Sequence, residues 1–179
     1  MTRFEELRIG DFFNIKHGYA FKSEFFADEG DFVLLTPGNF QEFGGLKLKG
    51  EKEKYYSASF PEQFLLEAGD IVVAMTDLTQ KSPILGAPAR IPQSNRYLHN
   101  QRLGKVVDLD TSRLDPAYLF FLLSYPPVRG QIKGSATGAT VKHTAPDRIR
   151  AVVAPVPPLR IQRRIASILS AYDDLIENN

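Results

Sequence analysis

The most regular hydrophobic pattern lies in the last twenty-five residues of the chain, which begin with a proline-rich stretch at 155–158. Apolar residues then recur at alternating steps of four and three residues, which is the spacing of a coiled-coil seam. A helix of about twenty residues with a single apolar face is marginal alone, so this face needs a partner helix in the same chain or in another one. The residues predicted to face the partner are Ile161, Ile165, Ile168, Leu169, Tyr172, Leu175 and Ile176.

Upstream of this helix, short apolar runs separated by glycine, proline and polar residues predict strands. The run at 71–75 is the clearest because it is β-branched and bounded by turn residues. Further strands are expected at 7–13, 31–36, 85–91, 103–109 and 151–156. Since the helices come late in the chain, the predicted fold class is α+β. We expect a mostly antiparallel or mixed sheet of short strands and a few helices, followed by a C-terminal coiled-coil-type helix.

Proline signals define the helices and a domain boundary. Asp115 followed by Pro116 is an N-cap with proline at the first helical position, and it predicts a buried helix at 117–124. Pro126 and Pro127 end that helix. A shorter helix is expected at 128–132 and a single helical turn at 144–149. The prolines at 155–158 predict a hinge, which divides the chain into a globular domain, 1–154, and a hinge with its helix, 155–179.

Composition excludes several classes of site. The chain has no cysteine, which excludes disulfides, zinc-thiolate sites and a cysteine nucleophile. No stretch approaches the roughly eighteen apolar residues of a membrane span, and the N-terminus lacks a signal-peptide pattern, so we expect a cytoplasmic protein. Acidic residues predominate in 1–77, whereas 78–107 and 116–146 contain none. Both segments contain lysine and arginine, so they would attract a polyanion if they shared a face of the protein. An ordinary solvated surface is the alternative.

Common catalytic and cofactor patterns are missing. There is no G-x-G-x-x-G turn, no Lys-Ser or Lys-Thr directly after the second glycine of the loop at 134–138, and no Glu-x-Lys of the kind found in many nucleases. The three histidines lie far apart and none has a zincin-like or triad-like neighbourhood. We therefore expect no catalytic residues, no metal site and no cofactor.

Two polar loops carry candidate nucleic-acid contacts. Residues 135–143 combine small residues, which allow close approach of a ligand to the backbone, with hydroxyls and a Lys-His pair that suit phosphates. Residues 76–81 follow the clearest strand and offer Thr, Asp, Gln and Lys, side chains that pair with base edges. An ordinary flexible turn and a capped polar turn are the respective alternatives.

The C-terminal motifs resemble those of a known family. A P-x-P-P hinge, Gln162-Arg-Arg-Ile165, a run of small residues and leucine, and Asp173-Asp-x-Ile-Glu177 are similar to the corresponding region of type I restriction–modification specificity subunits. Gly18-Tyr-Ala-Phe-Lys-Ser23, Gly69-Asp-Ile-Val-Val-Ala-Met-Thr76, Asn100-Gln-Arg102 and Gly138-Ala-Thr-Val-Lys142 resemble further motifs of that family in the same order. The resemblance covers nearly the whole chain.

This resemblance implies a non-catalytic target recognition domain that reads one half-site of double-stranded DNA. It also implies docking to a methyltransferase subunit and, through it, to a restriction subunit. The helix would pair with a second recognition domain or a second copy. It is shorter than the family's spacer helix, so a natural half-subunit and a shortened chain both stay open. The expected DNA-binding residues are Lys22, Thr76, Asp77, Gln80, Lys81, Arg90, Arg102, Lys133, Thr140, Lys142 and His143.

Two other functions stay open at this point. One is a small stand-alone methyltransferase or nuclease, and the other is a scaffold that only pairs with protein through its helix. If the helix is a docking element, Ile165→Asp or Ile168→Asp should disrupt docking and leave the globular fold intact.

Overall fold

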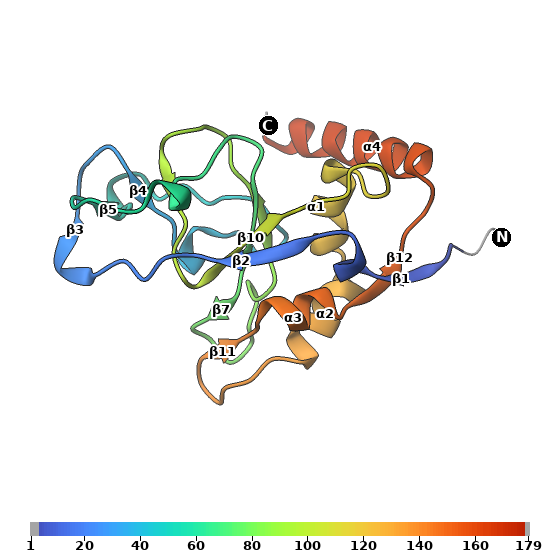
Figure 1. The fold of residues 1–179 in the computed structure, drawn as a ribbon, viewed down its shortest axis with the longest axis horizontal. Helices are drawn as coiled ribbons and strands as arrows, with labels where there is room; N and C mark the ends of the chain where they lie inside the picture. The colour runs from blue at the N-terminus through green and yellow to red at the C-terminus, as the bar shows by residue number, and fades with distance from the viewer. Residues whose placement is uncertain (1–3, 178–179) are drawn as a thin grey trace.

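The computed structural model describes residues 4–177, apart from the side chains of Asp174, Ile176 and Glu177. A central antiparallel sheet lies between a layer of helices and a smaller sheet (Figure 1). The central sheet has the strand order β2-β10-β6-β8, with bounds Asn14–His17, Leu103–Val107, Ile71–Ala74 and Pro88–Arg90. The edge position of β8 suits its proline, which has no N–H to donate to a neighbouring strand.

The smaller sheet is mixed and aromatic. Its order is β3-β5-β4-β9, with bounds Phe26–Ala27, Tyr55–Tyr56, Val33–Leu34 and Tyr97–Leu98. Strands β4 and β9 run parallel, and the other pairs are antiparallel. Phe21 packs edge-on against Tyr56, with ring centroids 4.8 Å apart. Short 3-10 helices lie at Ile9–Asp11, Ser23–Phe25, Pro37–Asn39, Gly50–Lys52 and Glu62–Phe64.

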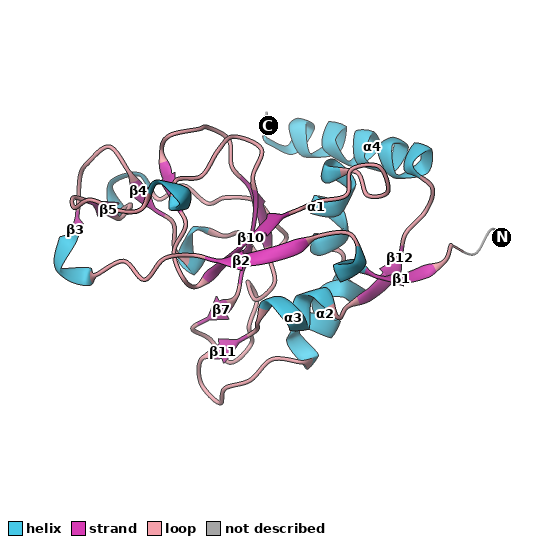
Figure 2. Ribbon diagram, viewed as in Figure 1, coloured by secondary structure: helices cyan, strands magenta, loops and turns pink. Residues whose placement is uncertain are grey.

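Four helices cover the other side of the central sheet and enclose the larger hydrophobic core (Figure 2). Asp115 begins α1 by accepting hydrogen bonds from the backbone N–H groups of Ala117 and Tyr118, at 3.0 and 3.1 Å. The helix ends at Tyr125 because Pro126 starts the next helix. The bounds are α1 Pro116–Ser124, α2 Pro126–Gly134, α3 Pro146–Arg150 and α4 Leu159–Glu177.

Two strand pairs complete the fold. Strand β1 (Glu6–Arg8) pairs with β12 (Val153–Pro155), which joins the N-terminus to the segment just before the hinge. Strand β7 (Thr76–Asp77) pairs with β11 (Lys142–His143) below the central sheet in Figure 1. Within the described range, the structure holds no helix long and apolar enough to cross a membrane.

The predicted α+β class is confirmed, but several predicted strands are too long. The expected strand at 7–13 breaks after β1, because Ile9–Asp11 form a 3-10 turn in which the Phe12 N–H donates to the Ile9 carbonyl at 3.2 Å. The strand at 31–36 is reduced to β4, since Thr36 and Asn39 cap a 3-10 turn. The strand at 85–91 becomes β8, because Gly86 turns the chain with a φ of 76°. Strand β2 was not predicted.

Candidate nucleic-acid interface and partner helix

Four of the motif segments meet at one end of the central sheet. Strand β7 continues from β6 and pairs with β11, so the loops at 76–81 and 135–143 lie side by side. The backbone N–H of Met75 donates to the carbonyl of Arg102 at 2.9 Å, and that of Gly18 donates to Leu103 at 3.3 Å. Tyr19 forms a bridge with Asn100. Segments distant in sequence therefore form one surface.

The loop at 135–143 folds as a hairpin. Thr137 and His143 exchange two backbone hydrogen bonds, of 2.9 and 2.8 Å. Gly138 turns the chain at a φ of 100°, and a Cβ there would collide with the carbonyl oxygen of Val141. His143 Nδ1 lies 3.1 Å from Thr76 Oγ1 and ties the hairpin to β7. This geometry gives Lys142 and His143 defined positions at the sheet end.

Asp77 and Thr76 are buried, which changes the role expected for them. Asp77 is 1% exposed, and its carboxylate accepts from Thr79 N–H (2.9 Å), Thr79 Oγ1 (2.8 Å) and Ile84 N–H (2.8 Å). A carboxylate engaged in this way holds its own loop and is not free to accept from a base. Gln80 and Lys81, in contrast, are exposed on that loop.

The other predicted contacts divide by position. Arg102, Thr140, Lys142 and His143 lie at the sheet end with the hairpin. Lys22 is exposed in the segment after Tyr19, with its Nζ 3.9 Å from Glu24. Arg90 is not part of this surface: it pairs with Ile71, at the opposite end of β6, and its guanidinium lies 5.6 Å from the Phe120 ring centroid.

Lys133 is half-buried on α2, beside the loop that follows β7. It lines a hollow of about 240 Å³ together with Glu42, Pro83 and Arg129. Burial lowers the pKa of the Lys133 ammonium, and the nearby Arg129 cation lowers it further. Lys133 is thus placed near the proposed surface but is less accessible than Lys81 or Arg102.

Arg129 and Gln162 are two buried residues that the sequence analysis did not select as sites. Arg129 donates to the backbone carbonyls of Leu85, Glu42 and Pro83. Its signal in the sequence is weak, because an arginine on a short helix is normally exposed. Gln162 lies four residues before the buried Ala166, and this spacing puts both on the same face of the helix. That spacing was the signal in the sequence that Gln162 is buried.

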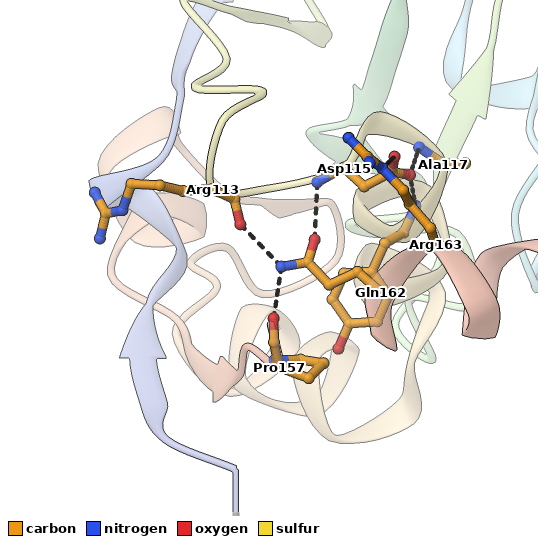
Figure 3. Close-up of polar contacts among 7 residues, drawn as sticks. Arg113, Asp115, Ala117, Pro157, Gln162 and Arg163 are labelled. Atoms are coloured by element: carbon orange, nitrogen blue, oxygen red, sulfur yellow. Dashed lines mark hydrogen bonds and ion pairs between the residues drawn. The ribbon is translucent and has the colours of Figure 1, made fainter. Parts of the chain in front are cut away.

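Gln162 locks the start of α4 to the start of α1 (Figure 3). Its Oε1 accepts from the Asp115 N–H at 2.8 Å, while its Nε2 donates to the carbonyls of Arg113 and Pro157 at 2.8 and 2.7 Å. Arg163 Nε lies 3.7 Å from Asp115 Oδ2. The direction in which α4 leaves the hinge is therefore set by hydrogen bonds.

The apolar stripe of α4 has a packed half and an open half. Ile161 and Ile165 are half-buried, and Ile165 packs against the main core. Four later members are exposed, at 49% for Ile168, 38% for Leu169 and 61% for both Tyr172 and Leu175. The side chain of Ile176 lies outside the described part of the chain. Because Ile165 packs against the main core, the structure changes the prediction for Ile165→Asp, which is now expected to disturb the globular fold as well as docking.

An apolar groove runs beside this stripe. It has a volume of about 240 Å³ and is lined mainly by aromatic and aliphatic side chains of α1 and α4, including Tyr118, Phe121, Leu122, Ile165 and Leu169. No group of three or more His, Asp and Glu residues able to hold a metal ion occurs among the described residues.

Comparison with known proteins gives a consistent family match. Residues 1–179 match the family model described as type I restriction modification DNA specificity domain. The specificity subunit of the type I restriction enzyme EcoBI from Escherichia coli is 28% identical over 156 residues. This similarity covers 87% of the present chain but only 29% of that subunit.

Solved structures share the fold. The type I restriction–modification S subunit from M. genitalium aligns with a TM-score of 0.68 at 18% identity, over 98% of this chain and 40% of that one. A chain from a structural study of complex assembly and conformational transition of the type I R-M system gives 0.66 at 18% identity, over 99% and 40%. The HsdS subunit from Thermoanaerobacter tengcongensis gives 0.61 at 17% identity, over 99% and 39%. The chain thus spans less than half the length of these relatives.

Proposed function

Because this chain belongs to the type I restriction modification DNA specificity domain family, we propose that it is a target recognition module that reads one half-site of double-stranded DNA. The observation that carries this proposal is the pairing of β7 with β11, which unites the polar loop at 76–81 with the Lys142–His143 hairpin. Either loop taken alone is equally compatible with a binding surface and with an ordinary turn. Together they form a basic and polar surface at one end of the central sheet.

The residues of this surface divide into two roles. Arg102, Lys142 and His143 supply donors for phosphate oxygens, and the exposed Lys22, in the segment after Tyr19, is a further candidate. Gln80 and Lys81 are exposed and extend from the loop after β7, where they suit hydrogen bonding to base edges in the major groove. Thr76 and Asp77 hold that loop through the contacts described above. Arg90 lies away from this surface, so its role as a DNA contact has no support from its position.

The open half of α4 is proposed as the link to other subunits. Its exposed residues Ile168, Leu169, Tyr172 and Leu175 continue the apolar groove beside α1. A partner helix laid along this stripe would bury both. We propose that this helix belongs to a second recognition domain or a second copy, and that the pair docks to a methyltransferase subunit and through it to a restriction subunit. We propose that the module itself performs no catalysis and that it binds its DNA in the cytoplasm.

Selection from randomised duplexes tests this function. The purified chain is mixed with a random-sequence duplex library at low salt, alone and with a methyltransferase subunit, and the retained DNA is sequenced. The expected result is enrichment of a single short motif. Retention of DNA without enrichment, or no retention in either mixture, would contradict sequence recognition. Methyl transfer or strand cleavage by the isolated chain would instead identify a stand-alone enzyme.

A further inference from the structure

The loop at 78–84, which follows β7, is held at both of its ends. At the first end, the Asp77 carboxylate accepts from the N–H of Thr79, and it reaches across the loop to the N–H of Ile84. Inside the loop, the buried Ser82 has a φ of 50°, in the left-handed region. Leu78, Gln80 and Lys81 stay exposed, with Leu78 at 60%. The loop thus has a defined backbone and an outward-facing tip.

Arg129, on α2, holds the second end of the loop, near Pro83 and Leu85. Its guanidinium donates through Nε to the carbonyl of Leu85 at 2.9 Å and through one NH2 group to Pro83 at 2.7 Å. The other NH2 group donates to the carbonyl of Glu42 at 2.9 Å, so one side chain joins α2 to two separate loops. Among the described residues, no carboxylate forms an ion pair with Arg129.

Burying the Arg129 guanidinium with no ion-pair partner among the described residues costs free energy, which its three hydrogen bonds must offset. Arg129 is 6% exposed, and burial lowers the pKa of its guanidinium, while the negative charges of Glu42 and Asp77 oppose that shift. A well-packed apolar side chain often fills a buried site as favourably as a buried ion does. What arginine adds is a planar fork of fixed donors. At this position the fork orients the carbonyls of Pro83 and Leu85.

We propose that Arg129 is a specificity-determining positioning residue. It fixes the far end of the 78–84 loop so that Gln80 and Lys81 meet base edges, and Leu78 meets a thymine methyl group, in register with the phosphate contacts of the hairpin. Reading bases requires side chains placed to within a fraction of an ångström. A loosened loop therefore discriminates less between DNA sequences, while its charge, and with it non-specific DNA binding, is unchanged. This inference rests on the proposed function.

Arg129→Met is the direct test, with Arg129→Lys as the conservative variant. Arg150→Met is the matched control, since Arg150 also donates to backbone carbonyls, those of Phe13 and Gly10, but makes no contact with the 78–84 loop. Dissociation constants are measured at one salt concentration for the enriched duplex and for a scrambled duplex. We expect Arg129→Met to weaken enriched-duplex binding about tenfold and to leave scrambled-duplex binding and its salt dependence unchanged. Arg129→Lys should show an intermediate loss, and Arg150→Met no change in the ratio.

Hydrogen exchange gives an independent measurement in the absence of DNA. Exchange at the Ile84 amide should accelerate in Arg129→Met and Arg129→Lys but not in Arg150→Met. An unchanged discrimination ratio in a folded Arg129 variant, or an equal loss on both duplexes, overturns the inference while the proposed function stands. If Arg129→Met does not fold, Arg129→Lys decides by the same criteria. Failure of the wild-type chain to distinguish any duplex overturns both.

Discussion

At the scale of single residues, the polar groups that matter most are buried ones that join elements. Gln162 is fully buried, and its amide is matched to three backbone groups of two separate segments. A buried polar group left without a partner costs about 1–3 kcal/mol. Such a residue holds two segments in a fixed relative position, and removing it leaves several buried backbone groups unpaired at the same time.

Gln162→Leu should destabilise the fold by roughly 3 kcal/mol, since it leaves the Asp115 N–H and the carbonyls of Arg113 and Pro157 unpaired. Urea unfolding followed by circular dichroism measures this loss. The exposed Gln93→Leu variant serves as the control and should change stability by less than about 0.5 kcal/mol. Equal stability of the two variants would show that the contacts in Figure 3 do not hold the hinge.

His99 makes stability depend on pH. It is 2% exposed, with Nε2 2.9 Å from the carbonyl oxygen of Leu103. Burial lowers its pKa from 6.5 to about 4, against the opposing effect of that carbonyl. Between these values the unfolded chain binds a proton that the folded chain does not. The stabilisation is therefore complete above pH 6.5 and is lost as the pH falls toward 4, by roughly 3 kcal/mol.

The comparison that isolates His99 is urea unfolding of the wild type and of His99→Gln at pH 7.5, 6.5, 5.5 and 4.5. Glutamine keeps a donor for the Leu103 carbonyl but does not titrate. The wild type should lose stability relative to the variant as the pH falls through this range. Parallel curves for the two proteins would mean that His99 has the same pKa in the folded and unfolded states, which would contradict the lowered pKa.

At the scale of elements, α4 is a helix with two environments. Its first turns are bonded to the start of α1 and packed on the main core. Its later turns carry the exposed apolar residues Ile168, Leu169, Tyr172 and Leu175. The same periodic pattern therefore serves two purposes along one helix, and substitutions in the two halves should have different effects.

Ile168→Asp should leave the thermal unfolding midpoint nearly unchanged and abolish helix pairing, because Ile168 is 49% exposed. Ile165→Asp should lower stability by roughly 2 kcal/mol, since it places a carboxylate against the core. Light scattering, with and without a methyltransferase subunit, measures pairing, and thermal melts measure the fold. Persistent pairing of Ile168→Asp would place the partner surface elsewhere.

At the scale of the whole molecule, charge is arranged by topology. The segments without acidic residues, 78–107 and 116–146, run through different parts of the fold but contribute Arg102, Lys142 and His143 to one end of the central sheet. A basic surface of this kind binds a polyanion by releasing counterions, so binding weakens as salt rises.

Lys142→Gln should lower the slope of log K against log salt by about 1, with similar proportional weakening on every duplex sequence. Filter binding of a single duplex from low to physiological salt gives the slope. Lys52→Gln, an exposed lysine outside the proposed surface, should leave the slope unchanged. The same slope in all three proteins would exclude Lys142 as a phosphate contact.

Much of the local structure was predictable because its causes are local. The Asp115-Pro116 cap and the Pro126-Pro127 stop placed α1 to within one residue, and the four-three spacing identified α4. The small-residue loop and the Thr76–Lys81 loop were recognised as polar and donor-rich. Family motifs along nearly the whole length were also readable, and the family match confirmed them.

The rest depended on contacts between distant segments. Very short strands such as β2, β7 and β11 exist only because a partner strand pairs with them, so short runs of sequence carry little signal for them. The burial of Asp77 and Arg129 follows from which loops meet α2, and periodicity does not encode that. The sequence by itself thus determined the helices, the fold class and the family. Only the tertiary structure decided which polar residues face solvent and which hold a loop. It also decided that 76–81 and 135–143 form one surface, because packing between segments distant in the sequence places both loops.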